Sequence, residues 1–391
     1  MGAESGSDAP LWQGINHGIA QFHFLSAIHE APAACLRCFR ERSSFSRMNT
    51  PLLPAQCPDC ETPRIFVVNE PLPQMRIERR AFLKKTMGAL AATAIAPFAQ
   101  AAKSGKSEPL VQQFAKTLTE AQRAKVWFPF DDRKRTLVDN NWHIVDEKLG
   151  SFFTKDQQAM VREIFLGLHS PEYAEKVMQQ VVHDSGKAGF EDSSVALFGE
   201  PASGKFEFVL TGRHCTRRCD GDSVEGAAFG GPIFYGHAAK SFNEEADHAG
   251  NVYWYQAKRA NAVFQMLDGK QREKALLARG REETGNDTVK LQGKNANIEG
   301  LAVADMTKDQ REGVHGVMRD LLAPFRKEDT DEAMKFIEAT GFEKLHMAFY
   351  KSGDIGNDGV WDVWQIEGPN MVWYFRGAPH VHVWVNIAAS A

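Results

Sequence analysis

One helix-start signature occurs four times along the 391-residue chain and constrains its fold more than any other feature. In this signature, the capping box, Thr or Asp precedes the first helical turn and Gln follows three residues later. Each of the two side chains accepts a hydrogen bond from a backbone N–H that the helix end would leave unpaired. An amphipathic run follows each copy, so we expect a helix at all four positions. The copies are Thr119 to Gln122, Thr154 to Gln157, Asp268 to Gln271 and Thr307 to Gln310.

The second and fourth copies read identically, Thr-Lys-Asp-Gln, and similar sequence follows each of them. In both cases a predicted helix, over about 171–183 or 330–339, precedes several strand-like segments. This order predicts an α+β fold in which helices pack on an antiparallel sheet. It also fits two duplicated halves, about 119–250 and 268–391, or else a coincidence of common caps and turns. Between the halves, 276–300 is polar and rich in Gly and Asn, as in a linker. The strand-like segments are 193–199, 205–217, 344–353, 360–375 and 380–388.

Residues 75–101 have the layout of a secretion signal, although they lie inside the chain. Adjacent Arg79 and Arg80 lead into a weakly apolar stretch that ends in the small-x-small pattern of a cleavage site. The Arg-Arg-x-Phe-Leu-Lys core resembles the twin-arginine export signal. We therefore expect cleavage after Ala101 and the twin-arginine export machinery as a partner. The mature chain, 102–391, is then expected to be periplasmic or otherwise extracytoplasmic.

Residues 1–74 do not read as a domain, because Pro and Ser interrupt every candidate helix. Translation from Met75 would give a signal of normal length, so we expect 1–74 to be untranslated or disordered. An alternative comes from two C-x-x-C pairs with the spacing of a zinc ribbon, in which four thiolates hold one ion. These cysteines are Cys35, Cys38, Cys57 and Cys60.

The composition of the chain excludes several classes of protein. A formal net charge of −4 without a basic stripe argues against nucleic-acid binding. No apolar run reaches the ~20 residues that a membrane-spanning helix requires.

Residues 199–205 match the phosphate-binding pattern G-x-x-x-x-G-K, but Phe206 follows where Ser or Thr would hold magnesium. We therefore interpret 199–205 as a hairpin turn. Cys215 and Cys219 lie too far apart on a straight strand for a disulfide, so we expect them to be unbridged.

The segment near the C-terminus, His380 to Ile387, is the most informative about function. Its Val and Ile residues alternate strictly with His380, His382, Trp384 and Asn386. Alternate side chains of a strand share a face, so both histidines lie opposite the valines. Their Cα atoms would be about 7 Å apart, close enough for both rings to bind one metal ion. The plain alternative is an inert His-Val-His sequence on a solvent-facing sheet.

Two ligands are too few for a tight metal site, so a third is needed. His214 is the first candidate, because it follows a strand-ending glycine at the place that Asn370 holds in the other half. The suspected repeat would put its strand beside the C-terminal strand. His237 and Glu244, in or beside an acidic segment, are the other candidates. Nitrogen ligands, with or without a carboxylate, suit a transition metal such as zinc, copper or iron.

Short motifs recur in a characteristic order: W-F-P-F-D-D-R (127–133), F-G-E-P (198–201), G-R-H (212–214), G-P-I-F-Y-G (231–236) and H-V-H-V-W (380–384). In this order the chain resembles the bacterial exported proteins of domain-of-unknown-function family thirty-five hundred. The resemblance spans most of 125–387. The resemblance implies a shared architecture and marks His214, His380 and His382 as candidate site residues. It implies no reaction, because the family has no established activity.

These features predict an exported metal-binding protein, and specifically a metal-dependent enzyme of unknown substrate. The rival hypothesis is a non-enzymatic extracytoplasmic binding module that holds carbohydrate or peptide on an aromatic sheet face. The residues of that face would be Trp361, Trp364, Trp373, Tyr374 and Trp384, unless they simply form the core.

Overall fold

The computed structural model describes residues 107–237, 252–352 and 360–391. The predictions for the start at Met75 and the signal at 75–101 concern residues outside these ranges. So do the predictions for Glu244 and for the four N-terminal cysteines, Cys35, Cys38, Cys57 and Cys60. In the ranges that are described, no helix is both long and apolar enough to span a membrane.

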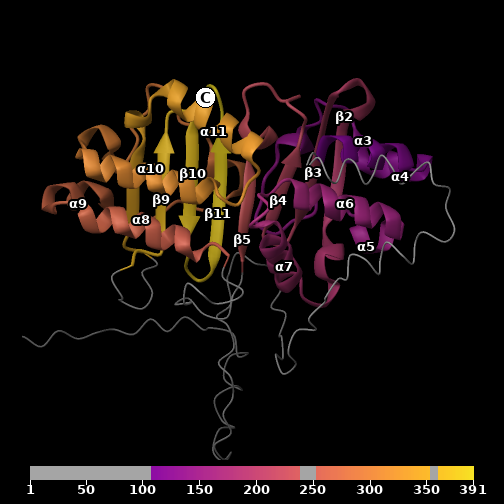
Figure 1. The fold of residues 1–391 in the computed structure, drawn as a ribbon, viewed down its shortest axis with the longest axis horizontal. Coiled ribbons are helices and arrows are strands. Elements are labelled where there is room, and N and C mark those ends of the chain that lie inside the picture. The colour runs from indigo at the N-terminus through magenta and orange to yellow at the C-terminus, as the bar shows by residue number, and fades with distance from the viewer. Residues whose placement is uncertain (1–106, 238–251, 353–359) are drawn as a thin grey trace, which may run out of the picture. The chain divides into compact units, whose positions relative to one another are not determined.

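One sheet contains all eleven strands of the described ranges (Figure 1). The order across the sheet is β1-β2-β3-β4-β5-β11-β10-β9-β8-β6, and β7 pairs with β8 outside this path. Among these strands, β1 with β2 and β6 with β8 are parallel, and the other pairs are antiparallel. The strands are β1 (Trp127–Phe128), β2 (Ser194–Glu200), β3 (Lys205–Gly212), β4 (Cys215–Cys219), β5 (Ile233–His237), β6 (Leu276–Leu277), β7 (Leu301–Ala302), β8 (His346–Tyr350), β9 (Val363–Gly368), β10 (Met371–Arg376) and β11 (Val381–Ile387).

Helices lie across one face of this sheet (Figure 1). The predicted α+β class, with helices packed on an antiparallel sheet, is therefore confirmed. The α-helices are α3 (Ser107–Thr117), α4 (Glu120–Val126), α5 (Leu149–Phe152), α6 (Lys155–Gly167), α7 (Ala174–Asp184), α8 (Trp254–Met266), α9 (Gly269–Ala275), α10 (Lys308–Leu322) and α11 (Lys327–Thr340).

All four predicted capping boxes form, at the starts of α4, α6, α9 and α10. The glutamines of these boxes also join the helices in pairs. The side-chain amide of Gln122 donates to Gln157 at 2.9 Å, and that of Gln271 donates to Gln310 at 2.9 Å. One residue type therefore caps its own helix and fixes the contact with a second helix.

The same order of elements occurs twice along the chain. In each half, a short strand follows the first capping-box helix and pairs in parallel with the first long strand. Two further helices and four long strands complete each half, α6-α7 with β2 to β5 and α10-α11 with β8 to β11. The sheet consequently reads the same from either edge towards its centre, where β5 pairs with β11. A duplicated unit would produce this order, and the duplication itself stays a prediction.

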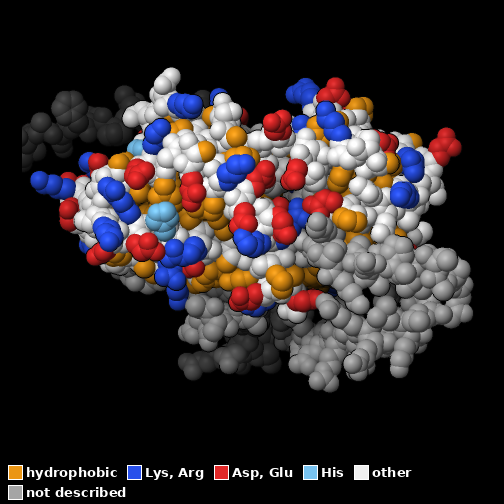
Figure 2. All heavy atoms as spheres, turned by 45° about the horizontal axis from the view of Figure 1, so that its top comes forward, with side chains coloured by type: hydrophobic (Ala, Val, Ile, Leu, Met, Phe, Trp, Pro, Cys, Tyr) orange, Lys and Arg blue, Asp and Glu red, His pale blue; other side chains and the backbone are white. Residues whose placement is uncertain are grey.

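Charged side chains of both signs are interspersed on the face of the molecule shown in Figure 2. A buried ion pair joins β3 and β4. Glu207 is fully buried and contacts Arg218 at 2.6 Å and Arg135 at 2.9 Å. Arg218 also donates to the carbonyl oxygens of Leu137 at 2.7 Å and Pro232 at 2.6 Å. This network fastens the segment after β1 onto the sheet.

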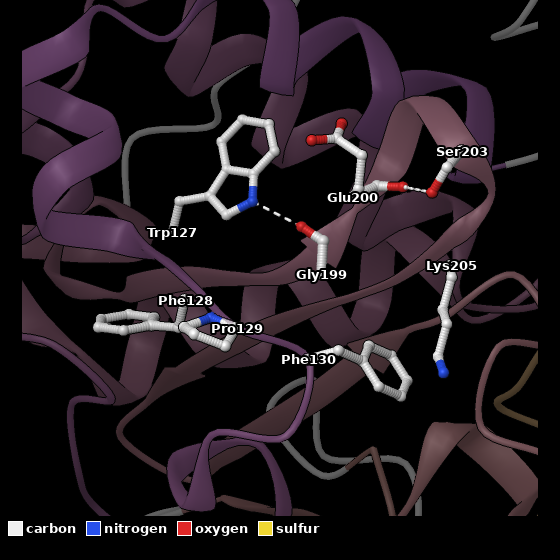
Figure 3. Close-up of a pocket in the computed structure, with 8 residues that line it drawn as sticks. All are labelled: Trp127, Phe128, Pro129, Phe130, Gly199, Glu200, Ser203 and Lys205. Carbon is white, nitrogen blue, oxygen red and sulfur yellow. Dashed lines mark hydrogen bonds between the residues drawn. The ribbon is translucent and has the colours of Figure 1, made fainter.

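The residues that resemble a phosphate loop form a hairpin turn, as predicted. β2 ends at Glu200, a short 3-10 turn follows, and Gly204 adopts a left-handed conformation with φ 85° before β3 begins. An open pocket of about 530 Å³ lies beside this turn (Figure 3). Within it the indole N–H of Trp127 donates to the carbonyl of Gly199 at 2.6 Å. The pocket is lined by Trp127, Phe128, Pro129, Phe130, Gly199, Glu200, Ser203 and Lys205.

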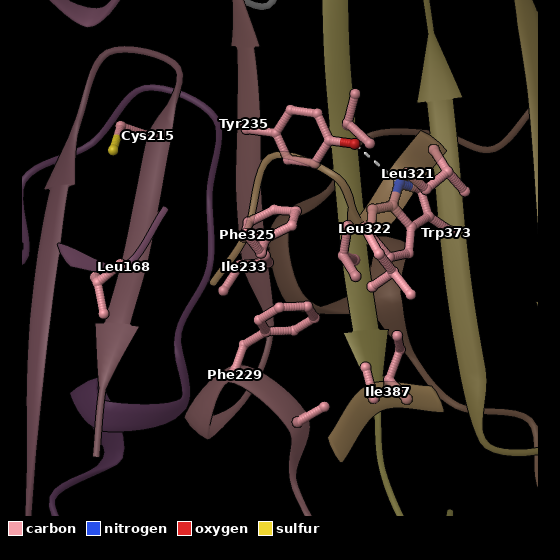
Figure 4. Packing of buried hydrophobic residues seen from close by; sticks show 14 of the residues in the cluster. Leu168, Cys215, Phe229, Ile233, Tyr235, Leu321, Leu322, Phe325, Trp373 and Ile387 are labelled. Carbon is pink, nitrogen blue, oxygen red and sulfur yellow. Dashed lines mark hydrogen bonds between the residues drawn. The ribbon is translucent and has the colours of Figure 1, made fainter. Parts of the chain in front are cut away.

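The main core lies between the helices and the sheet (Figure 4). There the indole N–H of Trp373 donates to the hydroxyl of Tyr235 at 3.1 Å, with Phe325 packed against both rings. Cys215 and Cys219 are buried and unbridged, as predicted, and burial raises the pKa of the Cys215 thiol to about 11.

The opposite face of the sheet is also buried, in a second cluster around Trp384. Residues of the predicted linker cover it, because Val289 belongs to this cluster and its carbonyl accepts a hydrogen bond from Asn386 at 3.0 Å. The aromatic side chains that the rival hypothesis placed on an exposed binding face are therefore core residues. Trp364, Trp373 and Trp384 are fully buried, Tyr374 is nearly so, and Trp361 packs half-buried against the core.

Candidate metal centre

Three histidines converge at one end of the central strands. His214 lies in the tight turn between β3 and β4, His380 just precedes β11, and His382 lies in it. The Nε2 atom of His380 is 3.1 Å from that of His214 and 3.0 Å from that of His382. One ring nitrogen from each residue lies within 4.8 Å of the others, and all three residues are buried. This is the spacing expected of nitrogens that share one ion at about 2.0–2.1 Å.

The sheet register explains how distant residues meet. Val381 of β11 lies opposite His237 of β5, and Tyr235 of β5 lies opposite Cys215 of β4. His214 is next to Cys215, so it reaches the start of β11 across the end of β5. The sequence prediction of adjacent strands was therefore wrong in this detail, because β5 separates them. Gly236 permits the close approach, since an added Cβ would lie 2.1 Å from the carbonyl oxygen of Val381.

His214 has an unusual backbone conformation, with φ 53°. A residue other than glycine rarely adopts this left-handed region, and such strain concentrates at functional sites. Its N–H donates to the carbonyl of Asn140 at 2.8 Å, which holds the turn in place. The turn thereby directs the His214 ring towards the start of β11, 4.8 Å from the ring of His380 between centroids.

Two buried carboxylates hold the outer nitrogens of the rings. Nδ1 of His214 lies 2.7 Å from Oδ2 of Asp184, the last residue of α7. Nδ1 of His382 lies 2.6 Å from Oε2 of Glu283. Each carboxylate accepts a hydrogen bond from Nδ1–H of its histidine. The proton therefore stays on Nδ1, and the lone pair is on Nε2, facing the other histidines. This carboxylate–histidine arrangement is typical of metal ligands.

The electrostatics of the site keep two of the imidazoles neutral. Burial, followed by the neighbouring histidines, holds the pKa of His380 well below its usual range. Burial, followed by the charge of Arg376, does the same to the pKa of His382. Burial alone would raise the pKa of Asp184, but its hydrogen bond to His214 and the nearby histidines outweigh burial and lower it. Neutral imidazole is the form that binds metal ions.

Of the remaining sequence candidates, only His237 lies in the described ranges, and it is not part of this group. His237 is buried on β5 opposite Val381, and cross-strand partners share a face, so it lies on the face opposite to His382. Its ring is near Tyr253, at 6.4 Å between centroids. His315, on α10, stacks on Phe342 at 3.7 Å. The pocket of Figure 3 contains none of the three clustered histidines.

Sequence reasoning missed both carboxylates. Asp184 is the last residue of an amphipathic helix, and no motif in the neighbouring sequence indicates that its carboxylate holds a histidine. Glu283 lies in the polar segment that was interpreted as a linker. In each case the partner histidine is far away in the sequence, so only the tertiary structure brings the pair together.

Comparison with known proteins identifies one family. The model of one family, described as protein of unknown function (DUF3500), matches residues 101–385. No curated protein and no solved structure shows significant similarity to the chain. Because the match spans most of the sequence and includes all three clustered histidines, the chain belongs to the DUF3500 family.

Proposed function

We propose that this protein binds one transition metal ion through His214, His380 and His382, and that it is a metal-dependent enzyme. The close approach of the three Nε2 atoms is the observation that carries the proposal. Because their Nδ1–H groups donate to carboxylates, His214 and His382 both direct Nε2 lone pairs towards His380. A proton on Nε2 of His380 could bridge to one of them but not to both. A metal ion bound to all three would remove this conflict.

The donor set fits zinc, copper or iron, since three imidazole nitrogens suit these ions. Three protein ligands leave a coordination position open, as in catalytic rather than structural zinc sites. When bound, the ion would supply Lewis acidity at that open position. The chain's own part would be to hold the three rings, and to keep the Nδ1–H groups of His214 and His382 hydrogen-bonded to Asp184 and Glu283.

The first test is the metal content of the purified protein, measured by elemental analysis. We expect about one equivalent per chain, and a visible Co²⁺ spectrum when stripped protein is reloaded with cobalt. Replacing Asp184 by Asn removes the charge behind His214 and should weaken metal binding about 10- to 100-fold. The matched control is Asp192→Asn, whose carboxylate pairs with the half-exposed Lys148 at 2.5 Å. Protein that neither contains metal nor takes up cobalt would refute the proposal.

Export by the twin-arginine route is the second part of the proposal. It is supported by the sequence of 75–101 and by the start of the family match at residue 101, beside the expected cleavage site. This route carries folded proteins, which suits a chain loaded with its metal before export. Replacing Arg79 and Arg80 by Lys should leave the precursor in the cytoplasm, whereas Arg76→Lys should not. N-terminal sequencing of exported protein should begin at Ala102, and a mature form that retains Cys35 to Cys60 would overturn this part.

A further inference from the structure

Two guanidinium groups lie near the three histidines, and they differ in their partners. Nε of Arg376 contacts Oε1 of Glu283 at 2.7 Å, so its charge is balanced by a carboxylate. Its Nη2 atom lies 2.5 Å from Nδ1 of His382, but a guanidinium cannot accept a proton. Nδ1–H of His382 therefore donates to Glu283, and Arg376 helps to fix that carboxylate.

Arg213 has no such partner among the described residues. It directly precedes His214, and the backbone of this turn is held by a bridge from Arg213 to Asn141. Its Nε atom is buried and has no hydrogen-bond partner, and no described carboxylate pairs with its guanidinium. The next arginines of the same hairpin are engaged, since Arg217 donates to the carbonyl of Phe234 and Arg218 contacts Glu207. A buried N–H without a hydrogen-bond partner is costly, and an anion bound at Arg213 would supply an acceptor for it.

Arg213 directly precedes His214 in the turn between β3 and β4, so its charge lies beside one of the three proposed ligands. With a divalent ion bound, Asp184 and Glu283 would at most balance the two charges of the metal. Arg376 and Arg213 then leave the site positive. The open coordination position of a positive site favours an anionic ligand.

We propose that the substrate is anionic, and that one of its carboxylate or phosphate groups binds beside the metal and pairs with Arg213. The inference rests on the proposed metal centre. The planar fork of the guanidinium matches the two oxygens of such a group. Arg213 would then select and orient the substrate, while Arg376 stays bound to Glu283.

The test uses the full chain loaded with Co²⁺, into which inorganic phosphate or acetate is titrated while the visible cobalt spectrum is recorded. We expect a saturable spectral change, and the anion that saturates at the lower concentration identifies the group. In Arg213→Gln the cobalt content should stay at one equivalent, but the apparent Kd should rise at least about tenfold. Arg213→Lys should lie between the two, because it keeps the charge and loses the fork.

The control variant is Arg319→Gln, whose exposed side chain pairs with exposed Glu312 on α10. It should respond to both anions as the unmodified protein does. The outcomes separate the two proposals. Protein without cobalt refutes the metal centre. If the cobalt-loaded protein shows no spectral change with either anion, the role of Arg213 is overturned and the metal centre stands. The same holds if Arg213→Gln binds the anions with unchanged affinity.

Discussion

Replacing His382 by alanine is expected to abolish stoichiometric metal binding. Its ring is fully buried, its Nε2 is 3.0 Å from that of His380, and its Nδ1 is held by Glu283. The substitution removes one of three ligands and leaves the Glu283–Arg376 pair without the ring that it orients. Because a structural zinc site contributes about 10–16 kcal/mol through four ligands, one lost ligand should weaken binding at least about a hundredfold. Competition with a chromophoric chelator measures this loss.

The matched control is His315→Ala, because this histidine stacks on Phe342 and lies outside the cluster. It should retain full metal content. A second readout separates loss of a ligand from loss of folding. A ligand that binds only the folded state raises the thermal midpoint, so metal should raise the Tm of the unmodified protein and of His315→Ala. It should not raise the Tm of folded His382→Ala. Full metal content in His382→Ala would contradict the ligand assignment.

The parts of the site that sequence predicted are those fixed by local rules. A strand has a period of two residues, so the alternation from His380 to Ile387 already puts His380 and His382 on one face. The valines between them lie in the main core, and Trp384 lies in the second cluster. The capping boxes are equally local, because each needs only a Thr or Asp and a Gln three residues later. These features depend on no distant contact, which is why they could be read directly.

The parts that sequence missed depend on how the sheet closes at its centre. The suspected repeat was the reason to consider the turn at His214, which lies with His380 and His382, but it did not predict β5, which separates that turn's strand from β11. Asp184 and Glu283 meet the histidines only through contacts far apart in the sequence. Residues 276–300, which were interpreted as a linker, instead cover one face of the sheet and bury Trp384. A polar, Gly-rich segment gives no sign that it will supply both a core residue, Val289, and the carboxylate of Glu283.

Replacing Glu207 by Gln is expected to have the largest effect on stability. The carboxylate lies at 2.6 Å from Arg218, and neither side chain is exposed. Removing one partner of a buried ion pair typically costs about 3–5 kcal/mol, because the other charge stays buried. This is a large part of the roughly 5–15 kcal/mol that stabilises a whole domain. The free energy of unfolding, measured with urea, should fall by about this amount. Here the loss should be large because Arg218 also holds the segment at Leu137 and cannot swing out to water without releasing it.

The surface pair Glu191–Arg162 provides the comparison, since its side chains are 39% and 26% exposed and 3.3 Å apart. Glu191→Gln should cost at most about 1 kcal/mol. Replacing both members of the fully buried pair, as in Glu207→Leu with Arg218→Met, should recover part of the stability lost in Glu207→Gln, because the charge of Arg218 is then removed together with its partner. Arg135, which also contacts Glu207, would still lose its carboxylate. The carbonyl oxygens of Leu137 and Pro232 would still lose their donor, so recovery should be incomplete. A loss below 1 kcal/mol in Glu207→Gln would mean that water reaches Arg218 and that this pair does not fasten the segment.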